Sequence, residues 1–165
     1  ASLYNPRAII YRFEQMMKSE FIAVAVVIET MINSEASGIA FSVHPVSQDQ
    51  NQIIIEAGLG LGESIVSGVI TPDNYLVSKE PLEMVEINVN QQTKILRRNN
   101  NGENEWLELD EIRANQQVLS APEILQLSKI VMEIEMHYGF PVDIEWAMEN
   151  NQFYIVQSRP ITTIT

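Results

Sequence analysis

The sequence predicts an α+β fold in which a mainly antiparallel sheet packs against a few helices. Three observations support this prediction: short runs of β-branched and apolar residues recur between polar turns, an amphipathic pattern extends over 121–138, and two further strand-like runs follow that pattern. At 165 residues, 45% of them hydrophobic, the chain has the size and composition of one folded domain.

A helix is expected over residues 7–18, near the start of the chain. Asn5 favours the position before the first helical turn, and Pro6 is tolerated inside that turn. Residues 21–31 follow, and because they are apolar and rich in β-branched side chains we expect them to form a buried strand. The apolar stripe that supports the helix consists of Ile9, Ile10, Phe13, Met16 and Met17.

Residues 37–42 are expected to pair with that buried strand after a polar turn. Residues 98–105 are polar and rich in asparagine, which indicates an exposed hairpin tip, and the acidic run over 103–111 indicates a solvated surface. A short helix is expected over 63–67. The remaining strands before the long helix are predicted over 53–57, 75–77, 83–88 and 93–97.

The clearest helix spans residues 121–138. Ser120 stands at the position that caps its first turn, and Glu123 stands where a capping box places a glutamate. Gly139 is expected to end the helix. The apolar face of the helix consists of Ile124, Leu127, Ile130, Val131 and Ile134.

Two segments near the C-terminus alternate polar and apolar residues, as half-buried strands do. A three-residue loop of Asn150–Gln152 would join them as an antiparallel hairpin, with Glu145 opposite Gln157 and Asp143 opposite Arg159. All four side chains would then lie on one face of the sheet. Oxygen ligands suit Mg²⁺ and a guanidinium suits phosphate, so this face is a candidate phosphate and metal site. The opposite face would carry Ile144, Trp146, Met148, Tyr154 and Val156.

Two alternatives to this interpretation stay open. A polar strand face is usually a solvated surface, and a facing Asp–Arg pair is usually a surface ion pair that contributes about 0–1 kcal/mol. The register is the second uncertainty: a two-residue turn would shift the pairing by one residue and move Gln157 and Arg159 to the opposite face.

Four ordered segments of this chain carry a resemblance to a known family. They are Ser2–Arg12, Met31–Ser42, Gly58–Gly68 with the following Thr71-Pro72-Asp73, and Asp143-x-Glu145 with Gln157-x-Arg159-Pro160. Together they resemble the ATP-binding domain of the phosphoenolpyruvate synthase and pyruvate phosphate dikinase family. The resemblance covers about residues 2–163 and implies that residues 1–165 are the C-terminal lobe of an ATP-grasp nucleotide-binding domain, a fragment of a larger enzyme.

The resemblance implies roles for the four polar hairpin residues, with ATP as substrate and Mg²⁺ as cofactor. Glu145 and Gln157 would hold the Mg²⁺ that bridges the ATP phosphates. Arg159 would bind a transferring phosphate. Asp143 would orient Arg159, assist a second metal or engage the attacking group.

Residues outside the hairpin are also implied by the resemblance to lie beside the nucleotide. Glu29, Met31 and Ile32 fall on the connection that passes the adenine ring, although Glu29 and Thr30 depart from the Gln-Lys that is more usual in the family. Glu63 would border the active-site cleft and orient Mg²⁺ or a basic side chain.

In its synthase form the family reaction converts pyruvate, ATP and water to phosphoenolpyruvate, AMP and phosphate through a phosphohistidine in a separate domain. The resemblance therefore implies three partners beyond this chain, which are an N-terminal lobe, a phosphohistidine domain and a pyruvate-binding domain. Without them the 165 residues would be inactive or nearly so. Pyruvate phosphate dikinases, glucan water dikinases and rifamycin phosphotransferases look similar over this lobe, and a non-catalytic interaction module is an alternative of another class.

The glycine-rich sequence Gly58-Leu-Gly60-Leu-Gly62 matches neither a Walker loop nor a dinucleotide fingerprint. It lacks a following Lys-Ser/Thr pair, and its third glycine comes too early. A strand-to-helix turn that needs a positive φ is the simpler interpretation. Thr71-Pro72-Asp73 is an ordinary turn sequence, and no chemistry is assigned to it.

Composition excludes several classes of function. The net charge of −12 argues against nucleic acid as a partner, because a phosphate backbone requires clustered Lys and Arg. No run of about 18 apolar residues is present, so no membrane span is expected. The absence of cysteine excludes disulfides and thiolate sites and agrees with a cytoplasmic location. His44 and His137 are expected to be structural or surface residues.

Overall fold

The computed structural model describes residues 2–16, 23 and 25–162 and divides the chain into two units, Ala1–Met31 and Ile32–Thr165. In the first unit a short 3-10 helix, Ser2–Tyr4, precedes helix α1, Pro6–Glu14. Asn5 caps α1, because its Oδ1 accepts a hydrogen bond from the Ala8 N–H at 2.7 Å. The helix is shorter than the predicted 7–18: it ends at Glu14, while residues 17 and 18 lie outside the described residues.

The strand predicted over 21–31 is not found in the part of that segment that the structure describes. Residues 23 and 25–31 belong to no strand, and residues 21, 22 and 24 lie outside the described residues. The expected partner strand does form, over Ala36–Phe41 (β1), but it pairs with two other strands, one on each side. A central strand has only two edges, and those of β1 are occupied by β2 and β7.

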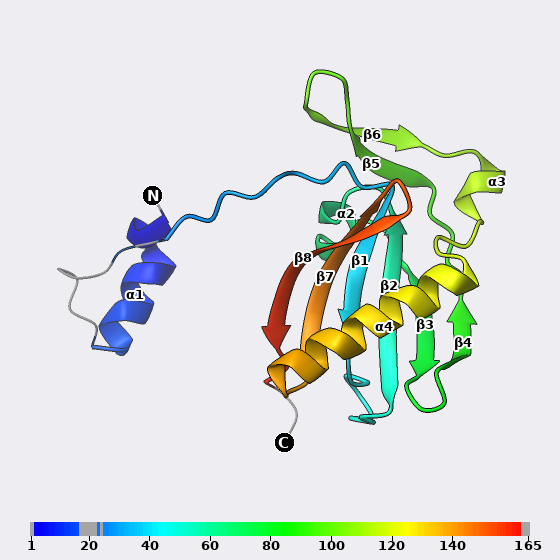
Figure 1. The fold of residues 1–165 in the computed structure, drawn as a ribbon. Helices are drawn as coiled ribbons and strands as arrows, with labels where there is room; N and C mark the ends of the chain where they lie inside the picture. The colour runs from blue at the N-terminus through cyan, green and yellow to red at the C-terminus, as the bar shows by residue number, and fades with distance from the viewer. Residues whose placement is uncertain (1, 17–22, 24, 163–165) are drawn as a thin grey trace. The chain divides into compact units, whose positions relative to one another are not determined.

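The second unit contains a six-stranded antiparallel sheet in the order β4-β3-β2-β1-β7-β8 (Figure 1). The prediction of an α+β fold with a mainly antiparallel sheet is confirmed. The other five strands are β2 (Gln52–Leu59), β3 (Asp73–Ser78), β4 (Glu83–Asn88), β7 (Val142–Glu149) and β8 (Gln152–Pro160).

Helix α4, Ala121–Tyr138, crosses one face of this sheet and has the predicted bounds (Figure 1). At its start the Glu123 carboxylate accepts a hydrogen bond from the Ser120 N–H at 2.6 Å. At its end Gly139 has a left-handed φ of 73°. The helix buries its apolar side chains against the sheet residues that alternate toward it, and this cluster is the core; it includes Ile53, Ile55, Tyr75, Val77, Ile124, Leu127, Val131, Ile144 and Trp146.

A separate two-stranded ribbon consists of β5, Lys94–Arg98, and β6, Asn104–Glu108. The predicted strand over 93–97 is therefore displaced by one residue, and β6 falls in the run that was expected to be only a solvated acidic surface. Charged residues are tolerated in β6 because they face cations across the ribbon: Arg97 Nε lies 3.0 Å from Glu105 Oε1. Two single-turn helices complete the fold, α2 over Glu63–Val66 and α3 over Glu111–Ala114.

Asp73, from the turn sequence Thr71-Pro72-Asp73, is fully buried and has a structural role. Its carboxylate accepts hydrogen bonds from the Tyr75 hydroxyl at 2.7 Å, the Val118 N–H at 2.9 Å and the Asn90 N–H at 3.0 Å. Burial raises the pKa of the Tyr75 hydroxyl above its ordinary value of 10, so this group remains a donor. The carboxylate thereby fastens two loops to the start of β3.

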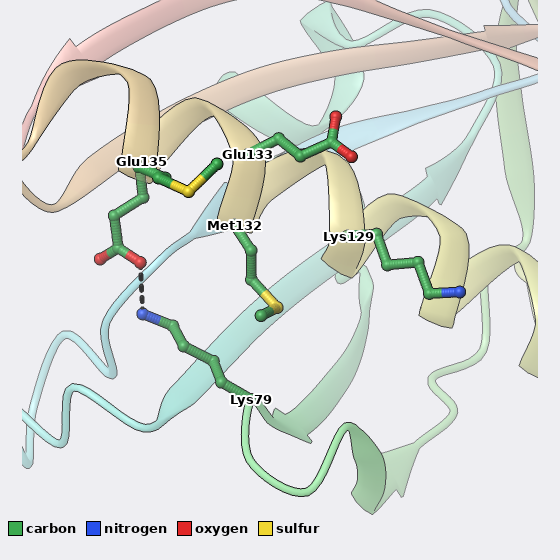
Figure 2. A pocket seen from close by; sticks show the side chains of 6 residues that line it. Lys79, Lys129, Met132, Glu133 and Glu135 are labelled. Carbon is green, nitrogen blue, oxygen red and sulfur yellow. Dashed lines mark hydrogen bonds and ion pairs between the residues drawn. The ribbon is translucent and has the colours of Figure 1, made fainter.

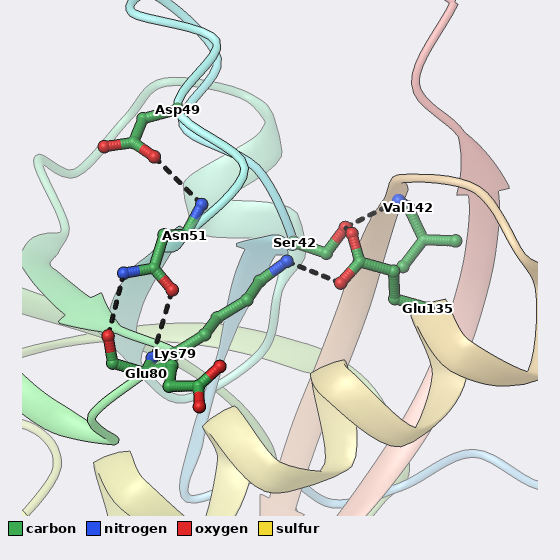
Figure 3. Close-up of polar contacts among 7 residues, drawn as sticks. All are labelled: Ser42, Asp49, Asn51, Lys79, Glu80, Glu135 and Val142. Atoms are coloured by element: carbon green, nitrogen blue, oxygen red, sulfur yellow. Dashed lines mark hydrogen bonds and ion pairs between the residues drawn. The ribbon is translucent and has the colours of Figure 1, made fainter.

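A second polar network lies where α4 meets the loops at one end of the sheet (Figure 3). Lys79 Nζ contacts Glu135 Oε2 at 2.5 Å, and Glu135 Oε1 accepts a hydrogen bond from the Ser42 hydroxyl at 2.9 Å. The Ser42 oxygen in turn accepts from the Val142 N–H at 2.9 Å. Beside it, Asn51 joins the backbone of Glu80 through both ends of its amide. No described helix is long and apolar enough to span a membrane.

Candidate functional site

The β7–β8 hairpin brings together the four polar side chains predicted from the sequence. Asp143 lies directly opposite Arg159, and Glu145 lies directly opposite Gln157. The alternate residues of β7, such as Ile144 and Trp146, are buried in the core beneath α4. The four polar side chains therefore share the face of the sheet that points away from α4.

The predicted pairing is present, but the predicted three-residue loop is wrong. The hairpin turn has two residues, Asn150 and Asn151, with φ of 52° and 59°, and Glu149 pairs with Gln152 across it. Such a turn alone would place Gln157 and Arg159 on the wrong face. A β-bulge corrects the register: the pairing shifts between Glu145 and Trp146, so that Val156 is an extra residue in β8.

The bulge also corrects the prediction for the core face of the hairpin. Tyr154 lies opposite Ala147 and so shares a face with Glu145, instead of packing with the core. Phe153 and Ile155 lie on the core side in place of Tyr154 and Val156. The Phe153 ring packs edge to face against the Trp146 ring, with the ring centroids 5.6 Å apart. Val156, the bulged residue, is 45% exposed.

The Arg159 guanidinium is shared by two carboxylates. Its Nε and Nη2 each lie 3.0 Å from Asp143 Oδ2, and Nη2 lies 3.6 Å from Glu145 Oε1. About half of the Arg159 side chain (53%) is exposed, whereas only 17% of the Asp143 side chain is. Exposed ion pairs contribute about 0–1 kcal/mol to folding, so this arrangement orients the guanidinium more than it stabilises the fold.

Asp143 keeps one oxygen without a partner. Its Oδ1 is buried and accepts no hydrogen bond from any residue that the structure describes. Buried carboxylate oxygens are usually satisfied, so this unpaired oxygen is an unfavourable feature of the hairpin. Oxygen atoms from Asp143, Glu145 and Gln157 are suitable ligands for Mg²⁺, which commonly binds one or two carboxylates together with substrate phosphates. The described residues contain no ready-made cluster of three acidic or histidine ligands, so substrate oxygens would have to complete the coordination.

Glu63, at the start of α2, lies on the same side of the sheet as the hairpin cluster. A Cβ atom added to Gly58 would lie 2.8 Å from Ile65, so α2 covers Gly58. Gly58 pairs with Ser37, and Ser37 pairs with Ala147, on the face that carries Glu145. The Glu63 carboxylate accepts a hydrogen bond from Asn104 Nδ2 at 3.1 Å, a contact with the β5–β6 ribbon.

The glycine-rich loop is a turn whose polar backbone groups are already paired. Three consecutive N–H groups, from residues 59 to 61, donate to Gln92 Oε1 and to the carbonyl oxygens of Glu35 and Leu96, each at 2.9 Å. The Gly60 carbonyl accepts from the hydroxyls of Ser34 at 3.0 Å and Ser37 at 2.6 Å. These N–H groups are therefore not free to bind phosphate, and Gly60, with φ of 80°, confirms the predicted need for a positive φ.

The remaining predicted site residues are not brought into the cluster by what the structure describes. Glu29 and Met31 belong to the first unit and Ile32 begins the second, all three without helix or strand. Their contact with adenine stays a prediction. His44 has a structural role as expected, because its Nδ1 accepts hydrogen bonds from the N–H groups of Val46 and Ser47 at 3.2 Å.

A groove of about 410 Å³ lies along α4, on the opposite side of the sheet from the cluster (Figure 2). Figure 2 shows Met132 beside the Lys79–Glu135 ion pair, with Lys129 farther along the helix. This groove shares no residue with the predicted site. It is lined by Lys79, Lys129, Met132, Glu133, Glu135 and Met136.

The whole chain is similar to known proteins. All 165 residues match the family model described as pyruvate phosphate dikinase, AMP/ATP-binding domain. Over 99% of its length the chain is 46% identical to a probable phosphoenolpyruvate synthase of Archaeoglobus fulgidus and 42% identical to one of Methanocaldococcus jannaschii. Over the same share it is 40% identical to a rifampicin phosphotransferase of Bacillus cereus. The chain spans 21%, 14% and 19% of the length of these three relatives, respectively.

Proposed function

The chain belongs to the AMP/ATP-binding domain family of pyruvate phosphate dikinase, and from this premise we propose that the face of its sheet that points away from α4 binds ATP together with Mg²⁺. The observation that supports this most is the bulged register of β7–β8, which sets Asp143 opposite Arg159 and Glu145 opposite Gln157. A guanidinium, two carboxylates and an amide then face one space, as binding of a metal-bound polyphosphate requires.

Arg159 binds a transferring phosphate group in this proposal. Its fork of N–H donors matches phosphate oxygens, and it stays charged at any working pH. Asp143 Oδ2 already holds the guanidinium through two contacts of 3.0 Å, so little side-chain freedom remains to be lost when phosphate binds. Asp143 is thus a positioning residue for Arg159.

Glu145 and Gln157 hold Mg²⁺ in this proposal, because these two residues, which both carry side-chain oxygens, lie directly opposite each other on the hairpin. When bound, Mg²⁺ supplies positive charge that offsets the charge developing on the phosphoryl group. Glu63 borders the same face, and Glu29, Met31 and Ile32 line the adenine. The antiparallel sheet with a helix on one side supports the assignment as the C-terminal lobe of an ATP-grasp domain.

The whole polypeptide, in this proposal, is a cytoplasmic phosphotransferase that forms phosphoenolpyruvate, AMP and phosphate from pyruvate, ATP and water. The likeness to phosphoenolpyruvate synthases supports pyruvate as the acceptor. The likeness to a rifampicin phosphotransferase supports an antibiotic acceptor as the second candidate. Both need partners beyond this chain: a first ATP-binding lobe, a phosphohistidine domain and an acceptor-binding domain.

Calorimetric titration of the full-length native polypeptide with Mg-ATP tests the site. Arg159→Ala should lower the affinity roughly 30-fold, because a hydrogen bond to a charged group contributes about 2 kcal/mol. Glu145→Ala should lower it at limiting Mg²⁺ and less at saturating Mg²⁺. Arg97→Ala is the matched control, since Arg97 also forms an exposed ion pair but lies on the separate ribbon. Unchanged binding in both hairpin variants would contradict the assignment.

A further inference from the structure

Glu56, on β2, lies on the same face of the sheet as the hairpin cluster. It pairs with Ile39 of β1, and Ile39 pairs on its other side with Glu145 of β7. Residues that lie opposite each other in neighbouring strands share a face, so Glu56 and Glu145 point to the same side with only Ile39 between them. Two strand spacings separate their backbones by roughly 10 Å.

The surroundings of Glu56 differ from those of two other enclosed carboxylates, Asp73 and Glu135. The residue is half-buried, yet its carboxylate has no hydrogen bond or ion pair with any described residue. By contrast, Asp73 accepts hydrogen bonds from several donors, and Glu135 contacts Lys79 and Ser42. Burial raises the pKa of the Glu56 carboxyl above its ordinary value of 4.5. A partly desolvated carboxylate without a partner is unfavourable for folding alone, which suggests a ligand.

The side chains next to Glu56 indicate which kind of ligand its carboxylate could bind. Asn74 lies directly opposite on β3, followed by Asn88 on β4, so the row across the sheet continues with neutral amides. The described residues provide no three-ligand acidic cluster, so Glu56 and the hairpin carboxylates do not converge on one ion directly. Mg²⁺ loses its coordinated water slowly and usually keeps several water molecules when it binds to a protein. A carboxylate on the same face, two strands from Glu145, is well placed to accept hydrogen bonds from that water.

We propose that Glu56 is a positioning residue of the metal site, which accepts hydrogen bonds from water coordinated to the Mg²⁺ held by Glu145 and Gln157. This inference rests on the proposed function and adds a residue to that site. Groups that orient the ligands of a metal commonly contribute 10- to 100-fold to its affinity.

Titration of the full-length native polypeptide with Mn²⁺, in the presence of a non-hydrolysable ATP analogue, tests this role. Electron paramagnetic resonance measures the free Mn²⁺ directly. Glu56→Gln keeps the shape of the side chain and removes its charge, and it should weaken Mn²⁺ binding about tenfold. Glu86→Gln is the control, because it removes a charge from the same face: Glu86 pairs with Leu76, in the row of residues across the sheet that includes Asp143. It should change the affinity less than twofold.

Glu56→Asp keeps the charge on a shorter side chain and should restore part of the lost affinity, which a purely structural role would not predict. Equal effects of Glu56→Gln and Glu86→Gln, with Glu145→Gln still abolishing binding, would overturn the role of Glu56 alone. Failure of the wild-type protein to bind Mn²⁺ with the analogue, or an unchanged affinity in Glu145→Gln, would overturn the proposed function as well. If Glu56→Gln does not fold, Glu56→Asp must itself weaken binding more than Glu86→Gln does.

Discussion

The β7–β8 hairpin and the glycine-rich loop are both distinctive in the sequence, but they differ in how many of their polar groups have hydrogen-bond partners. In the loop, the N–H groups of residues 59–61 and the Gly60 carbonyl are all paired within the chain. The hairpin instead contains all three buried side-chain atoms that lack a partner among the described residues: Asp143 Oδ1, Trp146 Nε1 and Ser158 Oγ. Only the first of these lies on the face that points away from α4. Paired polar groups stabilise a fold, whereas a buried group without a partner is unfavourable for folding, so the hairpin is the less satisfied of the two regions.

The largest expected effect follows from this comparison and concerns the loop. Gly60→Ala should destabilise the fold by about 3 kcal/mol, because φ is positive and the added Cβ would lie 2.2 Å from the Leu96 carbonyl oxygen. Gly68→Ala is the matched control: its φ is also positive, but no atom lies within 4 Å, so about 1 kcal/mol is expected. Urea unfolding measures both, and equal losses would show that the close approach is unimportant.

The next effect concerns the hairpin turn that fixes the register. Asn151→Ala should destabilise the fold by about 1 kcal/mol, because alanine tolerates a positive φ less well than asparagine does. Asn151→Gly should be at least as stable as the wild type. An alanine variant of unchanged stability in thermal unfolding would indicate that the bulge, and not the turn, determines the pairing.

A smaller effect on stability is expected where the comparison predicts a role in binding. Asp143→Ala should change the free energy of unfolding by less than about 1 kcal/mol, since the Arg159 side of its ion pair is about half exposed (53%). The same variant should lower Mg-ATP affinity by about tenfold, because Arg159 loses its orientation. A large loss of stability without a loss of affinity would show that Asp143 stabilises the fold and has no role in binding.

The smallest effect is the pH dependence contributed by Glu56. Its pKa is raised in the folded protein, so folding is favoured while the group is protonated, and this contribution is lost as the pH rises through the folded-state pKa. Glu56→Gln should therefore be slightly more stable than the wild type at pH 7. The difference should shrink as the pH falls through the raised folded-state pKa, and it should be smallest below 4.5, the ordinary value. Denaturant unfolding at pH 4 and pH 7 compares the two proteins. A difference that grows on acidification would contradict the shift.

Features that depend on residues close in sequence could be predicted, whereas features that depend on pairing between distant segments could not. Helix α4 and its termini follow from residues close in sequence, and alternation in β7 and β8 placed Asp143, Glu145, Gln157 and Arg159 on one face. The apolar run over 21–31 also satisfied the local pattern of a strand, but a strand requires a free partner edge. Ser34, Ser37 and Gln92 were missed, because their contacts with the glycine-rich loop join segments far apart in the chain.

The extra residue in β8 has a consequence for counting. Eleven residues, 146–156, separate Glu145 from its partner Gln157. An unbroken hairpin with a two-residue turn always leaves an even number between partners, so an odd interval requires either an odd loop or an irregular ladder. A relative that loses or gains one residue in this interval has an even number of residues there. Its hairpin must then lose the bulge or change the length of its loop, because otherwise the side chains at the positions of Glu145 and Gln157 would lie on opposite faces of the sheet.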